Sequence, residues 1–183
     1  MKTKLFQIGL ILLVIFGSTS CKKALENALS TEIPITGKSI VFEVDAATKP
    51  SEASATRAGE TEEVLYEGDL KINIAAELKK QGFSFENIKS FLITQGTIEE
   101  TAPSGFDMKG FVGAKLYFEN KTKLVAKAEK VEGNKVRFTI VNGELLDKLK
   151  EDNLHIILTG VRPNKKLKLR LVMDYKAKVS LIK

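Results

Sequence analysis

The chain has one cysteine and one histidine, Cys21 and His155, and these two residues limit the chemistry it can perform. A single thiol excludes an intramolecular disulfide and any metal site built from several thiolates. A single imidazole leaves little for zinc chemistry or for a relay of histidines. We therefore expect neither a metal ion nor another cofactor.

His155 stands in the segment Leu154-His155-Ile156-Ile157-Leu158. Strand alternation there turns the two leucines and Ile156 inward and His155 outward. A serine hydrolase needs a base beside its nucleophile, and the chain contains no Gly-x-Ser-x-Gly motif that would supply one. We interpret His155 as a surface histidine.

The carboxylates and glycines show no local catalytic pattern. Glu62-Glu63 and Glu99-Glu100 are adjacent pairs, and neighbours on a strand point to opposite faces. The glycines of the 104–113 segment match neither nucleotide-binding fingerprint, so we assign them to turns or a bulge. We therefore predict that the protein is not an enzyme. A glycosidase pair contributed by distant strands has no local signature and stays an alternative.

Positive side chains form a row on the last strand pattern. Lys168, Arg170, Lys176 and Lys178 alternate with apolar residues, and Asp174 is the only acid among them. Residues two apart on a strand share a face at a spacing of roughly 6–7 Å. This cationic row is our candidate binding site for an anionic glycan or lipopolysaccharide. The alternatives are a solvated face, or an edge strand whose lysines prevent association between sheets.

Charge is distributed unevenly along the 183 residues. Residues 21–108 carry 9 Lys and Arg against 15 Asp and Glu, whereas residues 109–183 carry 18 against 8. Strands of opposite sign can pair across a sheet, so this asymmetry also has a structural interpretation.

The first 20 residues have the pattern of a secretory signal peptide. Lys2 and Lys4 precede an apolar run from 5 to 16, and the small residues 17–20 follow it. The run is too short for a comfortable membrane span, which needs about 20 apolar residues.

Cys21 follows this segment directly, and the arrangement resembles the signal peptide of bacterial lipoproteins. Ser18, Thr19 and Ser20 replace the more usual Leu, Ala and Gly, as in looser sequences of the Bacteroidetes type. The resemblance implies cleavage by signal peptidase II, acylation of Cys21 and anchoring in a membrane by two or three acyl chains. It covers residues 1–21 and concerns anchoring only.

Lys22 and Lys23 follow the cysteine. In some lipoproteins of this type, acidic residues that resemble surface-export signals stand there instead. We therefore expect an outer-membrane lipoprotein of the cell envelope and favour its periplasmic side over the cell surface. In that compartment nucleic acid is not an expected partner, despite the formal net charge of +6.

Alternation of apolar and polar residues dominates from residue 38 onward and predicts an all-β domain. It is clearest at 167–181, where eight apolar residues occupy odd positions. Gly133-Asn134 suits a tight hairpin turn. The predicted strands are 40–45, 64–74, 84–100, 114–119, 123–129, 135–140, 154–161 and 167–181.

About eight strands with turns between them predict an antiparallel β-sandwich of the Greek-key, immunoglobulin-like type, with a closed barrel as the alternative. Two short helices are expected, at 75–81 before Gly82 and at 144–150 after Asn142. We expect residues 21–36 to be a tether and 37–183 to be one domain. The stretch 46–62 lacks large apolar residues and is expected to be a mobile loop.

These observations predict a lipid-anchored envelope protein with a non-enzymatic binding or assembly role, in contact with a protein, glycan or lipopolysaccharide. One alternative is a glycan-directed envelope enzyme with dispersed carboxylates. Another is an appendage subunit that assembles by strand addition at an open sheet edge.

Overall fold

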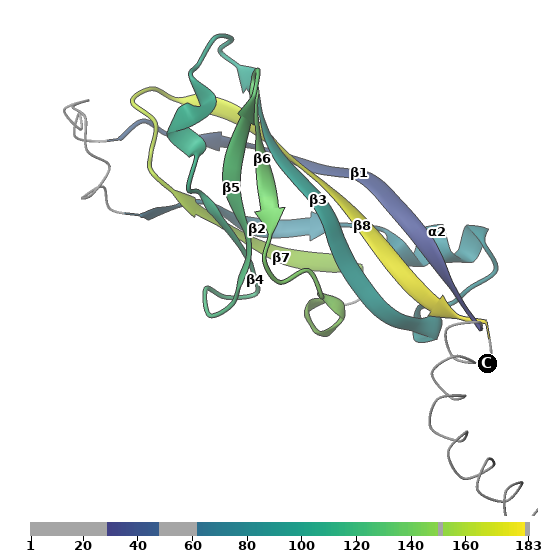
Figure 1. Ribbon diagram of the computed structural model, residues 1–183. Coiled ribbons are helices and arrows are strands. Elements are labelled where there is room, and N and C mark those ends of the chain that lie inside the picture. The colour runs from purple at the N-terminus through teal and green to yellow at the C-terminus, as the bar shows by residue number, and fades with distance from the viewer. Residues whose placement is uncertain (1–28, 48–61, 150–151, 182–183) are drawn as a thin grey trace, which may run out of the picture.

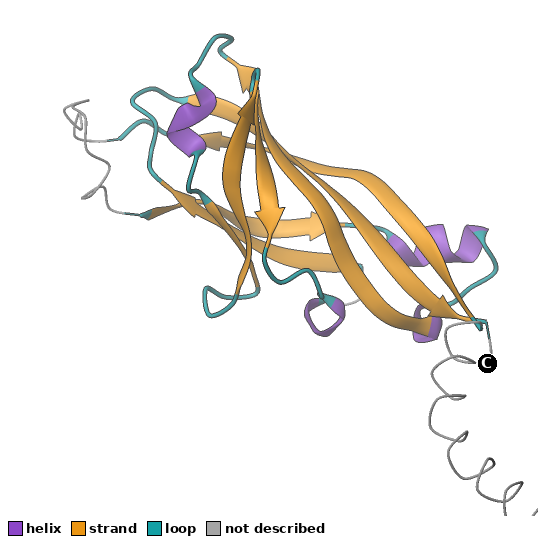
Figure 2. Cartoon of the chain, in the orientation of Figure 1, coloured by secondary structure: helices purple, strands orange, loops and turns teal. Residues whose placement is uncertain are grey.

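The computed structural model describes residues 29–47, 62–149 and 152–181, and the eight strands in these ranges form one antiparallel sheet (Figures 1 and 2). The strand order is β1-β8-β3-β6-β5-β4-β7-β2. The strands are β1 (Ser30–Val44), β2 (Glu63–Lys71), β3 (Ile88–Ala102), β4 (Lys115–Phe118), β5 (Leu124–Glu132), β6 (Lys135–Ile140), β7 (Asn153–Gly160) and β8 (Leu167–Ser180). The helices are α2 (Ile74–Lys80) and the 3-10 turns η1 (Phe85–Asn87), η2 (Met108–Phe111) and η3 (Leu146–Lys148).

The sheet curls into a nearly closed, barrel-like shape with one interior. The all-β class and the number of strands are confirmed, but the strands do not divide into the two packed sheets of a sandwich. The long strands β1 and β3 carry bulges, between Ile35 and Lys38 and between Ile93 and Gln95. Bulges increase local twist, and a strongly twisted sheet coils toward closure.

β8 forms the centre of the longest wall, between β1 and β3. Its odd residues from Leu167 to Val179 are all buried, and the even residues lie on the outer face, as the alternation predicts. Leu181 is the exception: it lies just beyond the strand, with 52% of its surface exposed.

The two ends of the sheet, β1 and β2, face each other across a seam that side chains close. The rings of Phe42 on β1 and Tyr66 on β2 lie 4.6 Å apart between centroids. The Tyr66 ring lies over Gly68, where an added Cβ would stand 2.9 Å from Tyr66 Cζ and closer still to the hydroxyl. Gly68 therefore provides the space that lets Tyr66 reach Phe42.

Helix α2 covers the end of the molecule where β1 begins (Figure 1). Its C-terminus is a Schellman cap, in which Phe83 N donates to Leu78 O at 3.0 Å and Gly82 N donates to Lys79 O at 3.1 Å. Gly82 has φ +81°, so the predicted C-cap glycine is confirmed. Lys38 Nζ lies 3.5 Å from Glu77 Oε1 and so links β1 to the helix.

Strand β1 begins at Ser30, inside the segment predicted to be a tether. Ile33 and Ile35 are buried and pair with Ala177 and Tyr175 of β8. Pro34 between them weakens the strand signal in the sequence, but proline is tolerated in a strand at the edge of a sheet. The structured part of the chain therefore starts before residue 37.

Three further predictions need correction or fall outside the described residues. The second helix is only the short turn η3, because Glu144 instead accepts hydrogen bonds from Phe91 N and Ser90 Oγ of β3. A bulge at Leu65 buries that residue and shifts the predicted alternation at the start of β2. Most of the predicted mobile loop, 48–61, lies outside the described residues, as does the whole segment 1–28.

The two predicted faces of β8 can be compared with one substitution on each. Leu171→Asp places an unpaired carboxylate among fully buried side chains and should cost at least about 4 kcal/mol of unfolding free energy. Lys168→Asp, on the exposed face, should cost less than about 1 kcal/mol. Urea unfolding followed by circular dichroism measures both, and equal costs would contradict the facing of β8.

The seam yields a second prediction. Gly68→Ala should lower the free energy of unfolding by about 1–3 kcal/mol, because the new methyl group pushes the Tyr66 ring off Phe42. Gly110→Ala is the matched control, since its Cβ would meet only ordinary contacts at 3.8 Å. A Gly68→Ala protein as stable as the control would contradict the close approach.

Candidate functional site

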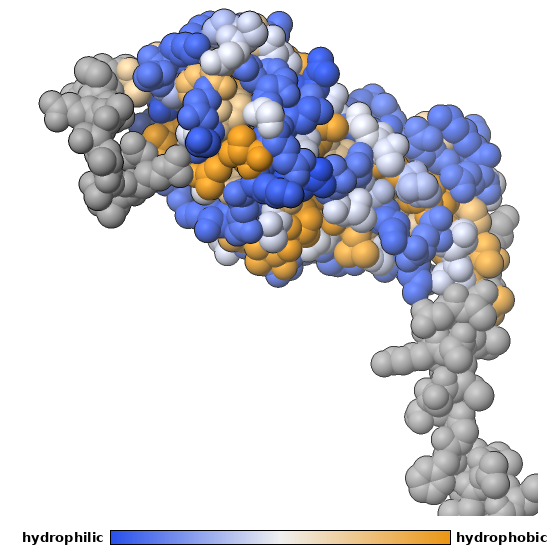
Figure 3. Space-filling model, turned by 45° about the horizontal axis from the view of Figure 1, so that its top comes forward, coloured by the Kyte–Doolittle hydropathy of each residue, from blue (hydrophilic) through white to orange (hydrophobic). Residues whose placement is uncertain are grey.

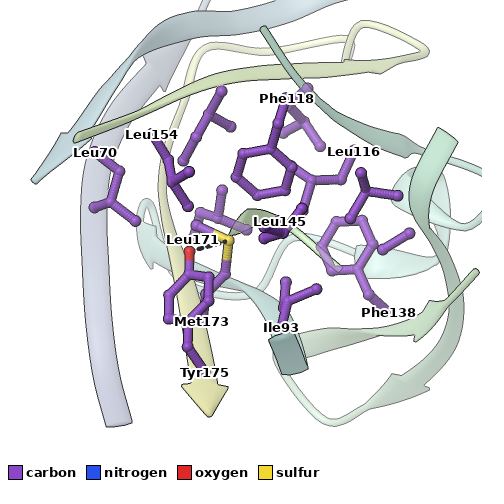
Figure 4. Close-up of a cluster of buried hydrophobic side chains, with 14 of the residues drawn as sticks. Leu70, Ile93, Leu116, Phe118, Phe138, Leu145, Leu154, Leu171, Met173 and Tyr175 are labelled. Atoms are coloured by element: carbon purple, nitrogen blue, oxygen red, sulfur yellow. Dashed lines mark hydrogen bonds between the residues drawn. The ribbon is translucent and has the colours of Figure 1, made fainter. Parts of the chain in front are cut away.

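Side chains fill the interior of the sheet (Figure 4). Leu171, Met173 and Tyr175 of β8 point toward leucine and phenylalanine side chains from β2, β4, β6 and β7. The buried Tyr175 hydroxyl donates to Met173 Sδ at 3.3 Å, and burial raises the pKa of this phenol. On the face of the molecule that Figure 3 shows, hydrophilic residues predominate and hydrophobic residues form separate patches.

The cationic row, Lys168, Arg170, Lys176 and Lys178, lies on the outer face of β8. Because β8 has neighbours on both sides, it is not an edge strand. The explanation of these lysines as protection for a sheet edge is therefore wrong. The row faces solvent between the outer faces of β1 and β3.

The half of the row near the end of β8 is matched by acidic side chains. Lys176 Nζ lies 3.0 Å from Glu32 Oε2, and Glu32 is also the register partner of Lys178. Asp174 Oδ1 accepts a hydrogen bond of 2.7 Å from Gly37 N, in the bulge of β1. Asp174, the only acid of the row, thus binds the backbone of the bulge in β1.

Lys168 and Arg170, in the half of the row near the start of β8, have different charged neighbours. Arg170 Nη1 lies 3.9 Å from Glu99 Oε2 of β3, and Lys135 Nζ of β6 lies 2.7 Å from Glu99 Oε1. Lys168 pairs in register with Glu43 of β1 and, after Lys166, contributes to lowering the pKa of its carboxyl. Arg170 therefore shares its carboxylate with a second cation.

Some ion pairs between neighbouring strands join the acidic first half of the sequence to the basic second half. Acids of the first half contact cations of the second half on a neighbouring strand in Glu32–Lys176 at 3.0 Å and Glu99–Lys135 at 2.7 Å. The structural interpretation of the asymmetry is thus confirmed for these pairs. They lie at the surface, where a single ion pair contributes about 0–1 kcal/mol.

The adjacent carboxylates separate to opposite faces, as predicted. Glu99 lies on the outer face, whereas Glu100 points inward and is buried. Glu100 accepts hydrogen bonds from Gly105 N at 3.1 Å and Phe106 N at 2.9 Å, so it fixes the loop after β3. This role explains a buried acid without invoking catalysis.

His155 lies at the surface, as predicted, but between two carboxylates that the sequence pattern did not identify as its neighbours. Its Nδ1 is 2.8 Å from Asp69 Oδ1, and its Nε2 is 3.3 Å from Glu67 Oε1. The hydrogen bond to Asp69 is the main cause of the raised pKa of His155, and Glu67 adds to it. Only the register of β2 on β7, which sets Asp69 opposite His155, could have revealed this cluster.

Among the described residues, no three His, Cys, Asp or Glu side chains are arranged to hold a metal ion. In the same part of the chain, no helix has the length and apolar character needed to cross a membrane. Cys21, the predicted lipidation site, precedes the described residues.

Comparison with known proteins identifies no family. No family model and no curated protein matches the chain. Among solved structures, it is similar to the BFDV capsid protein in its 60-mer form, with a TM-score of 0.34, 7% identity, and coverage of 82% of this chain and 93% of that one. It is also similar to the BFDV capsid protein in its decameric form, with a TM-score of 0.35 and 9% identity. That match covers 81% of this chain and 99% of the capsid protein chain. Likeness at these TM-scores carries no conclusion about this chain.

The His155 cluster predicts a pH dependence of stability. Because the folded pKa is raised, protonated His155 stabilises the folded state fully below about pH 6.5, and this contribution is lost as the pH rises through the folded pKa. The gain should be at most about 1 kcal/mol, since the side chain is 37% exposed and the pair is screened.

Chemical unfolding of wild type and His155→Gln at pH 5.5 and pH 8 tests this prediction. The stability advantage of the wild type should be larger at pH 5.5, where more of the histidine is protonated. An advantage that is the same at both pH values would contradict the ion pairing.

Proposed function

We propose that the protein is a lipid-anchored component of a bacterial cell envelope with a binding or assembly role and no catalytic activity. The observation that carries this proposal is Cys21, the only cysteine, directly after an apolar segment and four small residues. Acyl chains on that thiol would hold the domain at a membrane surface. The periplasmic side of an outer membrane is the favoured location.

The geometry of the domain suits attachment by its N-terminus. Ser30 begins β1 nine positions after Cys21, and even a fully extended chain of that length reaches only about 30 Å. Leu181 N donates to Leu29 O at 2.7 Å, so the first and last strands meet at the same end of the barrel. The end of β1 and the loop joining β7 to β8 lie at the opposite end (Figure 1).

The interior and the outer face support binding rather than catalysis. A sheet filled with side chains offers its outside to a partner, and the cationic row on β8 makes that outside attractive to anions. A glycan or lipopolysaccharide with carboxylate or phosphate groups fits this charge. The proposed role is to hold such a molecule, or a protein that carries one, close to the membrane.

Assembly by strand addition is less well supported. The seam edges of β1 and β2 already face each other through Phe42 and Tyr66. The earlier part of β1 carries Pro34 and the Gly37 bulge, both of which discourage pairing with another chain.

Replacing the thiol tests the anchor. In cells that process lipoproteins, the wild type should partition with membranes and gain the mass of the acyl chains. Cys21→Ser should lose the added mass and either become soluble or accumulate as precursor. A correctly cleaved Cys21→Ser protein that stays fully in the membrane fraction would refute lipid anchoring.

A further inference from the structure

A positive surface runs across the strands beside Arg170, and β5 and β6 supply most of it. We call it the cross-strand patch and define it by the cations Lys130, Lys135, Arg137 and Arg170 and the acids Glu99 and Glu132. Its members come from four neighbouring strands, β8, β3, β6 and β5. Lys168 flanks it on β8.

The register places these side chains in two adjacent rows. In the first row Arg170 pairs with Glu99, Glu99 with Lys135, and Lys135 with Glu132. In the second row Val172 pairs with Thr97, Thr97 with Arg137, and Arg137 with Lys130. With strands about 4.8 Å apart, each row spans about 14 Å of the outer face.

Each acid of the patch lies between two cations. Glu99 is held by Lys135 at 2.7 Å and by Arg170 at 3.9 Å. Glu132 is held by Lys130 at 3.1 Å and by Arg137 at 2.9 Å, and these two cations lower the pKa of its carboxyl. The patch therefore has twice as many cations as carboxylates. Glu129, beyond the second row, is hydrogen-bonded to Thr139 at 2.8 Å.

The cations are also the outermost charges. The side chains of Arg170, Lys135 and Arg137 are 45–47% exposed and that of Lys130 is 73% exposed. Glu99 is only 18% exposed and Glu132 38%. A molecule that approaches this face meets ammonium and guanidinium groups before it meets carboxylates.

The contrast with the far end of the cationic row is clear. Lys176 and Lys178 stand beside Glu32 and follow Asp174, so positive and negative charges there are more nearly equal. The excess of cations over acids on this wall is thus greater in the cross-strand patch than at the far end of the row.

We propose that the cross-strand patch binds an anionic polysaccharide whose repeating carboxylate or phosphate groups lie across the strands and displace Glu99 and Glu132 from their cations. This inference deepens the proposed binding function and rests on it. An extended polyanion fits better than a single small anion because the cations are arranged in rows on an open sheet face. Arginine and lysine together provide both the forked and the point-like donors for such groups.

The test uses purified full-length mature protein and three probes of defined charge: polygalacturonate, polyphosphate and neutral dextran. Affinity is measured by isothermal titration at 50 mM and 300 mM NaCl. The wild type should bind one or both of the anionic polymers, more weakly at the higher salt concentration, and should not bind dextran. Absence of binding at 50 mM NaCl would overturn the proposal.

Paired variants locate the site. Lys135→Gln/Arg170→Gln should weaken binding at least tenfold, whereas Lys176→Gln/Lys178→Gln, which removes the same charge from the same face, should change it less than twofold. Equal losses in the two variants would mean diffuse attraction by net charge and would overturn the site.

A third variant changes binding in the opposite direction. Glu99→Gln removes the competing carboxylate and should tighten binding severalfold, a gain that damage to the fold would not produce. Unchanged or weaker binding by a folded Glu99→Gln protein would contradict displacement. Equal affinity for a single-stranded DNA of the same charge would overturn the assignment to polysaccharide.

The binding tests of the cross-strand patch and the Cys21→Ser test of lipid anchoring can fail separately. If the cross-strand patch fails these tests while Cys21→Ser leaves the membrane, the binding site is wrong and lipid anchoring stands. If binding follows the patch but Cys21→Ser stays in the membrane, the anchor is wrong and the patch stands.

Discussion

Closure of a single sheet is the constraint on which the rest of the structure depends. An eight-stranded sheet has two edges, and here β1 and β2 meet where the sheet curls round. The described residues of these strands form no hydrogen-bonded ladder with each other, so Phe42 and Tyr66 close the seam by ring contact. The close approach depends on a position without a side chain, Gly68. With the seam closed, every strand shares one interior, which is lined mainly by apolar side chains, and most charged side chains lie on the outer face.

The sequence was most informative where one strand is buried on one face only. The strict alternation of β8 predicted its facing residue by residue, and Gly82 and Gly133-Asn134 predicted a helix end and a hairpin. Alternation cannot distinguish a sandwich from a barrel, because inward and outward residues alternate in the same way in both. It also failed at the bulge beside Leu65 and at Pro34, where a local irregularity hides a strand that tertiary pairing stabilises.

The candidate site was predictable only along a single strand. Spacing on β8 identified Lys168, Arg170, Lys176 and Lys178 as sharing a face, and the structure places them there. What distinguishes the two halves of that row is supplied by residues far away in sequence, Glu32 and Glu99 with Lys135. Those neighbours depend on strand order and register, which a single sequence does not reveal. The same is true of His155, whose carboxylate partners lie on β2.

The pairing of β1 with β8 also has a mechanical side. The register joins the two strands from Ser30–Ser180 to Val44–Leu167, nearly the whole length of both. A force applied through the residues before Ser30 would act along β1, parallel to the strand. A ligand bound to the wall formed by β8, β3 and β6 would hold β8 in place against that force. The hydrogen bonds of this ladder would then be sheared together rather than opened one after another. A domain tethered in this way would bear tension through its longest pair of strands.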